Sequence, residues 1–148
     1  MNKFKINWSD LDENRQNALA EFSGFYALVA ENIEDEASTE VDLLYIGMAY
    51  ERTILNLVKQ PYRAFDFLEE YEKLNLDMET FFMVGLLQEN APNETPKNIF
   101  SNIQCLLVRQ NEPLFNVPCK EIKSNHTANL SITNSGDYEP LEEFSDSL

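Results

Sequence analysis

Histidine and cysteine are scarce in this sequence, and their scarcity excludes several kinds of site. The chain has one histidine, His126, and two cysteines, Cys105 and Cys119, with no paired Cys motif, so a zinc site is not expected. The two cysteines follow no spacing pattern, and in a cytoplasmic chain we expect both to be free thiols. Because no histidine is expected beside it, Cys105 is interpreted as a small core residue and not as a nucleophile.

Long apolar runs are also absent. No stretch of about 18 apolar residues occurs, so the sequence predicts no membrane-spanning helix. Residues 1–16 lack the apolar segment of a secretory signal, and we therefore expect a cytoplasmic location. The hydrophobic share of 43% is that of an ordered globular protein. In a chain of 148 residues, we expect one domain over residues 1–136 and an acidic, frayed tail over residues 137–148.

Basic residues are few compared with acidic ones. Eleven Lys and Arg face 26 Asp and Glu, which gives a formal net charge of −15. Proteins that bind nucleic acid usually gather basic residues to neutralise phosphates, so this charge disfavours a nucleic-acid partner. The acidic residues gather at 31–42, 66–79 and 137–146. They form either a solvated surface or an acidic face that meets a basic protein.

The apolar patterning predicts alternating strands and helices within the domain. Short aromatic and β-branched runs predict strands, while apolar residues at helical spacing predict helices. The expected strands cover residues 24–29, 43–47 and 80–87, with a strand-like stretch at 128–133, and the expected helices cover residues 13–22, 49–59, 64–73 and 98–109. This order predicts a small α/β sandwich of the α+β kind.

Two tripeptides mark the first two expected strands. Gly24-Phe25-Tyr26 begins the first strand and Tyr45-Ile46-Gly47 ends the second, with eighteen mostly acidic or small residues between the two tyrosines. Farther along, the helix end Leu106-Leu107-Val108-Arg109 is followed by Pro113 and, three residues later, by Asn116. In this order and on these elements, the three patterns resemble the GIY-YIG nuclease family, with phenylalanine in place of the usual isoleucine. The resemblance spans roughly residues 22–136.

The resemblance implies both a fold and a chemistry. The fold is a small sheet of three antiparallel strands flanked by helices. The chemistry is phosphodiester hydrolysis with one divalent metal ion, in which a tyrosine helps to activate water, an arginine stabilises the developing charge and a glutamate holds the metal. Mg²⁺ prefers carboxylate oxygens and lowers the pKa of its bound water. A guanidinium adds fixed hydrogen-bond donors where negative charge grows.

When the family's catalytic positions are carried over residue by residue, only some of them hold the expected residue type in this sequence. Tyr26 and Tyr45 occupy the two tyrosine positions. The arginine position, about ten residues after the second tyrosine, falls on Leu55, and the nearest arginine is Arg52. The metal-binding glutamate position falls on Gln104, whose neutral amide is a poor Mg²⁺ ligand. The other motif positions are held by Gly24, Gly47 and Asn116.

Each of these residues also has a simpler structural interpretation. The two tyrosines can form a cross-strand aromatic pair in a half-buried sheet. Gly24 and Gly47 can serve as a helix stop and a strand-to-helix turn. Arg52 fits a solvated helix position, and Gln104 fits a partly buried amide on the helix that carries Ile103.

Three functional hypotheses follow from this mixture. The first is a degenerate GIY-YIG-like domain, weak or inactive as an enzyme, that acts as a binding or regulatory module for a basic protein and needs no cofactor. The second is an active Mg²⁺-dependent nuclease with a relocated site that uses Tyr26, Tyr45, Arg52 and another carboxylate, such as Glu89 or Glu112. The third is an acidic mimic of nucleic acid that inhibits a DNA-binding protein.

Overall fold

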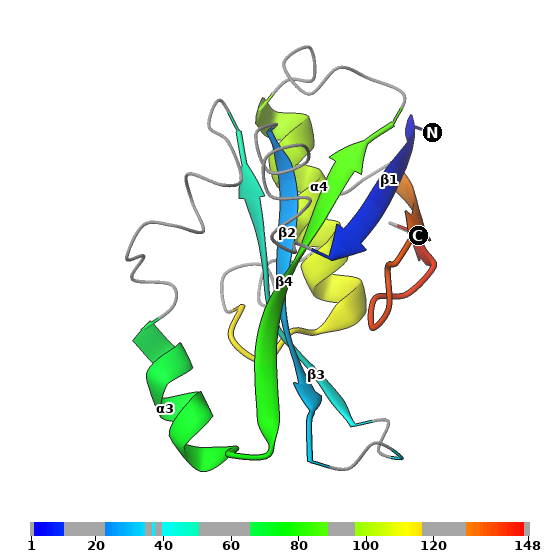
Figure 1. The fold of residues 1–148 in the computed structure, drawn as a ribbon. Helices are drawn as coiled ribbons and strands as arrows, with labels where there is room; N and C mark the ends of the chain where they lie inside the picture. The colour runs from blue at the N-terminus through cyan, green and yellow to red at the C-terminus, as the bar shows by residue number, and fades with distance from the viewer. Residues whose placement is uncertain are drawn as a thin grey trace.

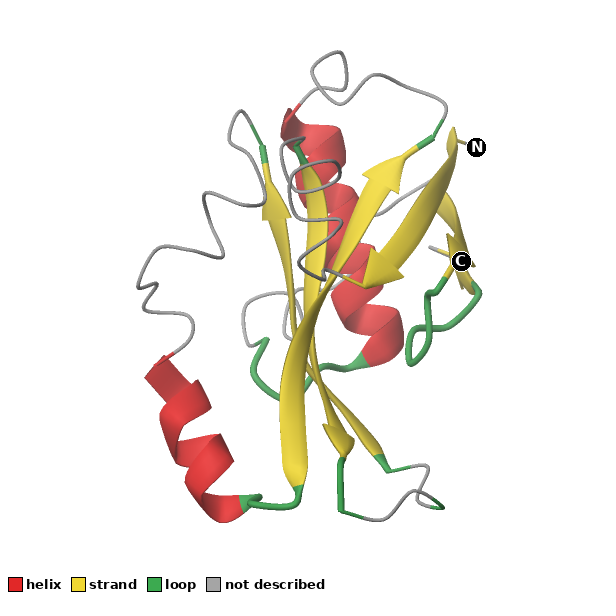
Figure 2. Ribbon diagram, viewed as in Figure 1, coloured by secondary structure: helices red, strands yellow, loops and turns green. Residues whose placement is uncertain are grey.

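A computed structural model describes residues 2–10, 23–34, 37, 40–50, 66–88, 97–116 and 130–146. Over these residues the chain forms an α+β fold with one sheet and two helices (Figures 1 and 2). The elements are β1 (Asn2–Asp10), β2 (Gly24–Asn32), β3 (Val41–Ala49), α3 (Asp66–Leu74), β4 (Met78–Leu87), α4 (Lys97–Asn111), β5 (Leu130–Gly136) and β6 (Phe144–Asp146).

Most predicted elements are confirmed where the structure describes them. The strands expected at 24–29, 43–47 and 80–87 correspond to β2, β3 and β4. The helices expected at 64–73 and 98–109 correspond to α3 and α4, and the strand-like stretch near 128–133 is β5. The helix expected at 13–22 lies outside the described residues, as do residues 51–59 of the helix expected at 49–59, whose first residue, Ala49, instead ends β3.

The sheet is larger than the three-stranded, mostly antiparallel sheet that the sequence predicted. Its six strands have the order β3-β2-β4-β1-β5-β6, so the expected strand number is wrong. β1 and β5 run parallel, and every other neighbouring pair is antiparallel. The three predicted strands form one half of the sheet, with β2 between β3 and β4, and the unpredicted β1 joins that half to β5 and β6.

β1 has a clear physical reason to be a strand. Phe4, Ile6 and Trp8 alternate with exposed Lys3, Lys5 and Asn7, which is the pattern of a strand with one buried face. Trp8 is 1% exposed, and its indole N–H donates to Asn134 Oδ1 of β5 at 2.9 Å.

The two described helices lie against opposite faces of the sheet. α4 places a stripe that includes Phe100, Ile103 and Leu107 against Phe25 and Ile46 of β2 and β3. On the other face, Tyr71 of α3 belongs to a smaller cluster with Leu28, Ala30, Leu44 and Met78. In Figure 1, α4 passes behind the sheet while α3 lies near the lower end of β4.

The end of α4 is fixed by its local sequence. The Glu112 N–H donates to the Val108 carbonyl at 2.8 Å, and Glu112 has a φ of 47°, the left-handed conformation that commonly ends a helix. Pro113 follows and cannot continue the helical hydrogen bonds. The chain then turns toward β3.

The chain beyond β5 turns back onto the sheet. The Asn134 N–H donates to the Glu143 carbonyl at 2.7 Å, and β6 pairs with β5. Leu141, in the stretch that the sequence analysis set apart as an acidic tail, is buried in the core. None of the helices that the structure describes is long and apolar enough to cross a membrane.

The expectation that both cysteines are free thiols is wrong for Cys105. Cys105 on α4 is disulfide-bonded and not the free thiol that the sequence predicted. The other cysteine of the chain, Cys119, lies outside the described residues. The spacing of two isolated cysteines gave no signal of pairing, because a disulfide depends on how the fold brings the two chain segments together.

Candidate functional site

The two motif tyrosines lie side by side on neighbouring strands. β2 and β3 pair antiparallel, with Tyr26 opposite Gly47 and Leu28 opposite Tyr45. The ring centroids of Tyr26 and Tyr45 are 6.1 Å apart in a stacked arrangement, and the ring of Phe82 on β4 meets Tyr26 edge-on at 6.4 Å. The predicted antiparallel pairing of these strands is therefore confirmed.

Burial distinguishes the two tyrosines. Tyr26 is 3% exposed, whereas Tyr45 is half-buried. A tyrosine that helps to activate a water molecule must bring its hydroxyl within hydrogen-bond reach of that water. The aromatic contacts of Tyr26 instead give it a packing role, which agrees with the interpretation of a cross-strand aromatic pair.

Gly47 is required by the ring of Tyr26. A Cβ atom built at residue 47 would lie 2.2 Å from Tyr26 Cζ and 2.3 Å from its hydroxyl oxygen. No real side chain tolerates such distances, so the ring occupies the space that a side chain at this position would need. The position of the tyrosine ring in the first tripeptide therefore requires glycine in the second. Gly24, the first glycine of the motif, lies opposite Ala49 in the same strand pair.

The peptide group of Ile46, at the centre of the second tripeptide, is held by two amide side chains. Asn116 accepts from Ile46 N–H at 2.7 Å and donates to the Ile46 carbonyl at 2.8 Å. Gln104 Nε2 donates to the same carbonyl at 3.1 Å. Asn116 is 4% exposed, so its two bonds replace the strand partner that the outer edge of β3 lacks at this point.

The backbone after α4 continues this covering of the edge. Leu114 N–H donates to the Leu43 carbonyl at 3.0 Å, and Phe115 N–H donates to the Leu44 carbonyl at 2.9 Å. Together with Asn116, residues 114–116 follow β3 as a short irregular partner. The backbone groups of β3 that make these bonds are therefore not available to pair with another chain.

The structure gathers the predicted residues into two groups on different sides. Tyr26, Tyr45 and Gly47 share the sheet face of α3, whereas Gln104 belongs to α4 on the opposite face and meets β3 at Ile46. Arg52, Leu55 and Glu89 lie outside the described residues, and Glu112 follows the end of α4. In the part of the chain that the structure describes, no group of three or more His, Cys, Asp or Glu residues is placed to hold a metal ion.

A third tyrosine, Tyr71 of α3, was not predicted as a notable residue. Its hydroxyl donates to Asp42 Oδ2 of β3 at 2.6 Å. Burial and this hydrogen bond raise the pKa of Tyr71 well above its usual value, because both favour the neutral phenol over the phenolate. Tyr71 is therefore a structural hydrogen-bond donor, since a nucleophile or base needs the opposite shift.

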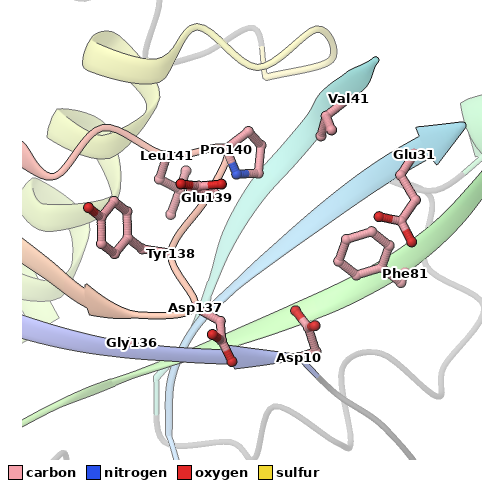
Figure 3. A pocket seen from close by; sticks show the side chains of 10 residues that line it. All are labelled: Asp10, Glu31, Val41, Phe81, Gly136, Asp137, Tyr138, Glu139, Pro140 and Leu141. Carbon is pink, nitrogen blue, oxygen red and sulfur yellow. The ribbon is translucent and has the colours of Figure 1, made fainter. Parts of the chain in front are cut away.

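An open pocket of about 890 Å³ lies on the α4 side of the sheet (Figure 3). It is formed where the ends of β1 and β2 approach the loop between β5 and β6. Ten of the residues that the structure describes line it; four of these carry carboxylates and none is basic. The carboxylates belong to Asp10, Glu31, Asp137 and Glu139. The other lining residues are Val41, Phe81, Gly136, Tyr138, Pro140 and Leu141.

The amino-acid sequence indicates this pocket only through its charge. Glu31, Asp137 and Glu139 belong to two of the acidic stretches, far apart in the chain. Of the residues proposed as catalytic, metal-binding or motif residues, none that the structure describes lines the pocket. Its assembly depends on the pairing of β1 with β4 and β5, which the sequence analysis did not predict.

No family model, curated protein or solved structure matches the chain. The fold and the site define it as an α+β protein with a mixed six-stranded sheet, a stacked pair of tyrosines and an acidic pocket.

Proposed function

We propose that this chain is a degenerate GIY-YIG-like domain that does not cleave nucleic acid and acts as a binding or regulatory module for a basic protein. The observation that carries the proposal is the hydrogen bond from Gln104 to the Ile46 carbonyl. The family resemblance gives this position to the glutamate that holds the metal. Here an amide nitrogen is used to bind a backbone oxygen, and a glutamate carboxylate could not make that bond.

The burial of Tyr26 supports the same proposal. In the family the tyrosines assist a metal-bound water, and that role requires access to solvent and substrate. Tyr26 is instead enclosed by Tyr45, Phe82 and the backbone at Gly47. Asn116 similarly has both ends of its amide bound to one peptide group. The motif residues thus have structural roles that hold without catalysis.

The competing hypothesis of an active nuclease requires a relocated metal site. Glu112 lies just after α4, and Glu89 and Arg52 lie outside the described residues, so that site would have to form around residues other than Gln104. Mg²⁺ would then be the cofactor. The net charge of −15 also opposes the approach of a polyanionic substrate at physiological salt.

The third hypothesis, an acidic mimic of nucleic acid, is favoured by a specific observation. Among the described residues, the lining of the pocket carries four carboxylates and no basic side chain. A mimic and a module for a basic protein use the same attraction, but only the mimic competes with DNA for its partner.

The proposed cytoplasmic location has one observation against it, because disulfides such as that of Cys105 are rare in reducing compartments.

The experiment that tests the proposal is a cleavage assay with plasmid and oligonucleotide DNA, in Mg²⁺ or Mn²⁺ at physiological salt. We expect no cleavage above a protein-free control, because losing even one preorganised electrostatic contact typically costs on the order of 10²–10³ in rate. Tyr45→Phe tests the motif, and Tyr50→Phe, which removes one hydroxyl from a half-buried tyrosine that contacts Phe100, is the matched control. Metal-dependent cleavage lost in the first variant and kept in the second would refute the proposal.

A further inference from the structure

The acidic pocket combines charge from separate segments with an apolar floor. Asp10 ends β1, Glu31 lies near the end of β2, and Asp137 and Glu139 belong to the loop after β5. In Figure 3 their side chains surround a space bordered by the ring of Phe81. These four carboxylates therefore converge only in the folded chain.

The floor of the pocket is built from the edge of the main core. Phe81, Tyr138 and Leu141 line the pocket and also pack against or belong to the core cluster under α4. Val41 at the start of β3 is 41% exposed and adds apolar surface to the lining. A ligand that fits must therefore satisfy carboxylates and cover apolar surface together.

The arginine side chain has this combination of properties. Its guanidinium carries a permanent positive charge and donates paired hydrogen bonds to carboxylates. Its flat faces stack on aromatic rings, and its methylene groups cover apolar surface. Phosphate groups are disfavoured by the same logic, because the described lining residues carry four carboxylates and no basic side chain. The pocket thus selects cations with apolar bodies.

We propose that this pocket is the docking site for an arginine-bearing segment of a basic protein. The inference rests on the proposed binding role and gives that role a location on the face opposite the tyrosine pair. Pockets for drug-sized ligands measure roughly 300–1,000 Å³, so about 890 Å³ accommodates an arginine together with neighbouring residues of its chain. An extended segment can lie along the open pocket, with its arginine between Phe81 and the carboxylates.

The proposal is tested with a fluorescein-labelled hexapeptide of alternating arginine and glycine. Its binding to the full chain is followed by fluorescence anisotropy, and the same peptide with citrulline in place of arginine is the neutral control of similar shape. We expect saturable binding of the arginine peptide that weakens as salt rises, and no measurable binding of the citrulline peptide. Equal binding of the two peptides, or no binding of either below millimolar concentration, would overturn the proposal.

Matched variants separate this pocket from the general negative charge of the protein. Glu31→Gln with Glu139→Gln removes two charges from the pocket, and Glu70→Gln with Glu143→Gln removes two exposed charges that do not line it. We expect the pocket pair to weaken binding on the order of tenfold, since exposed ion pairs contribute modestly and two are lost. The control pair should change affinity by less than about twofold. Equal losses in the two pairs would show unspecific attraction and refute the site.

A titration followed by ¹H–¹⁵N NMR locates the contact independently of the variants. Peptide-induced shifts should centre on the amides of Phe81, Tyr138 and Leu141, and shifts centred on α3 or spread over all acidic segments would contradict the proposal. Spermidine is the second probe, and binding as tight as that of the peptide would assign the pocket to polyamines and overturn the protein partner. Peptide binding tests only the pocket, and the cleavage assay tests only the proposed absence of nuclease activity. Each proposal can therefore be refuted without the other.

Discussion

The contact between Gly47 and Tyr26 gives the sharpest test of the structure. Replacing Gly47 by alanine would place a Cβ atom 2.2 Å from Tyr26 Cζ. The ring cannot move aside freely, because Tyr26 is 3% exposed and meets the rings of Tyr45 and Phe82. Overpacking of this kind typically costs about 1–3 kcal/mol. Without a clash, the same substitution in a strand would stabilise by roughly 0.5–1 kcal/mol.

A double-mutant cycle isolates this contact. Tyr26→Ala alone should cost about 3–5 kcal/mol through the lost ring, and adding Gly47→Ala to it should cost nothing further, because the obstructing ring is gone. The coupling energy should therefore be about 1–3 kcal/mol in magnitude. Tyr26→Phe is the control, since it removes the hydroxyl but leaves Cζ in place. Gly47→Ala should remain destabilising on that background.

Urea unfolding followed by the fluorescence of Trp8 measures all four free energies. Trp8 is the single tryptophan of the chain and is 1% exposed, so its emission reports loss of the core. A Gly47→Ala variant that loses less than about 0.5 kcal/mol, or that stays equally destabilising beside Tyr26→Ala, would refute the proposed register of Tyr26 and Gly47.

Two further predictions concern hydrogen bonds. Gln104→Glu should lower the free energy of unfolding at pH 7 by about 1–3 kcal/mol, because a carboxylate cannot donate to the Ile46 carbonyl; stabilisation of this variant by millimolar Mg²⁺ in the same urea assay would contradict the structural role and favour a metal site. For Tyr71, whose pKa is raised above the usual 10.0 by burial and the bond to Asp42, the stabilising contribution is full below pH 10 and is lost as pH rises further, because only the unfolded chain releases its proton readily. The stability difference between the native chain and Tyr71→Phe should therefore shrink above about pH 10, and a difference that stays constant from pH 8 to 11 would refute the assignment.

The strands found from the sequence are those with strong local patterns. β2, β3 and β4 contain apolar and aromatic runs such as residues 24–30, and these runs predict strands whatever their partners. β1 was missed because Lys3, Lys5 and Asn7 separate its apolar residues and lower its average hydrophobicity. Its parallel pairing with β5 places Asn2 beside Leu130, and no local pattern encodes a contact between residues so distant in the chain.

The candidate site was also predictable from the sequence only in part. The proximity of Tyr26 and Tyr45 was predictable, because the two motif strands are consecutive and pair antiparallel. The partner of Gln104 was not, because Ile46 is 58 residues away and the glutamine side chain itself does not specify a backbone oxygen. The pocket draws its carboxylates from three separate segments, so the sequence could indicate its charge and not its position.

The motif residues therefore have structural roles that account for them without a reaction. Tyr26 occupies the volume that makes glycine necessary at residue 47, and Asn116 satisfies a peptide group on a strand edge. Removing either would disturb the packing or hydrogen bonding of the sheet, whether or not the protein acts on a phosphodiester. The groups that would be expendable for folding and required for hydrolysis are a metal-binding carboxylate and an exposed tyrosine hydroxyl. Gln104 has no carboxylate and Tyr26 is 3% exposed, which is why we propose that these two positions serve the fold.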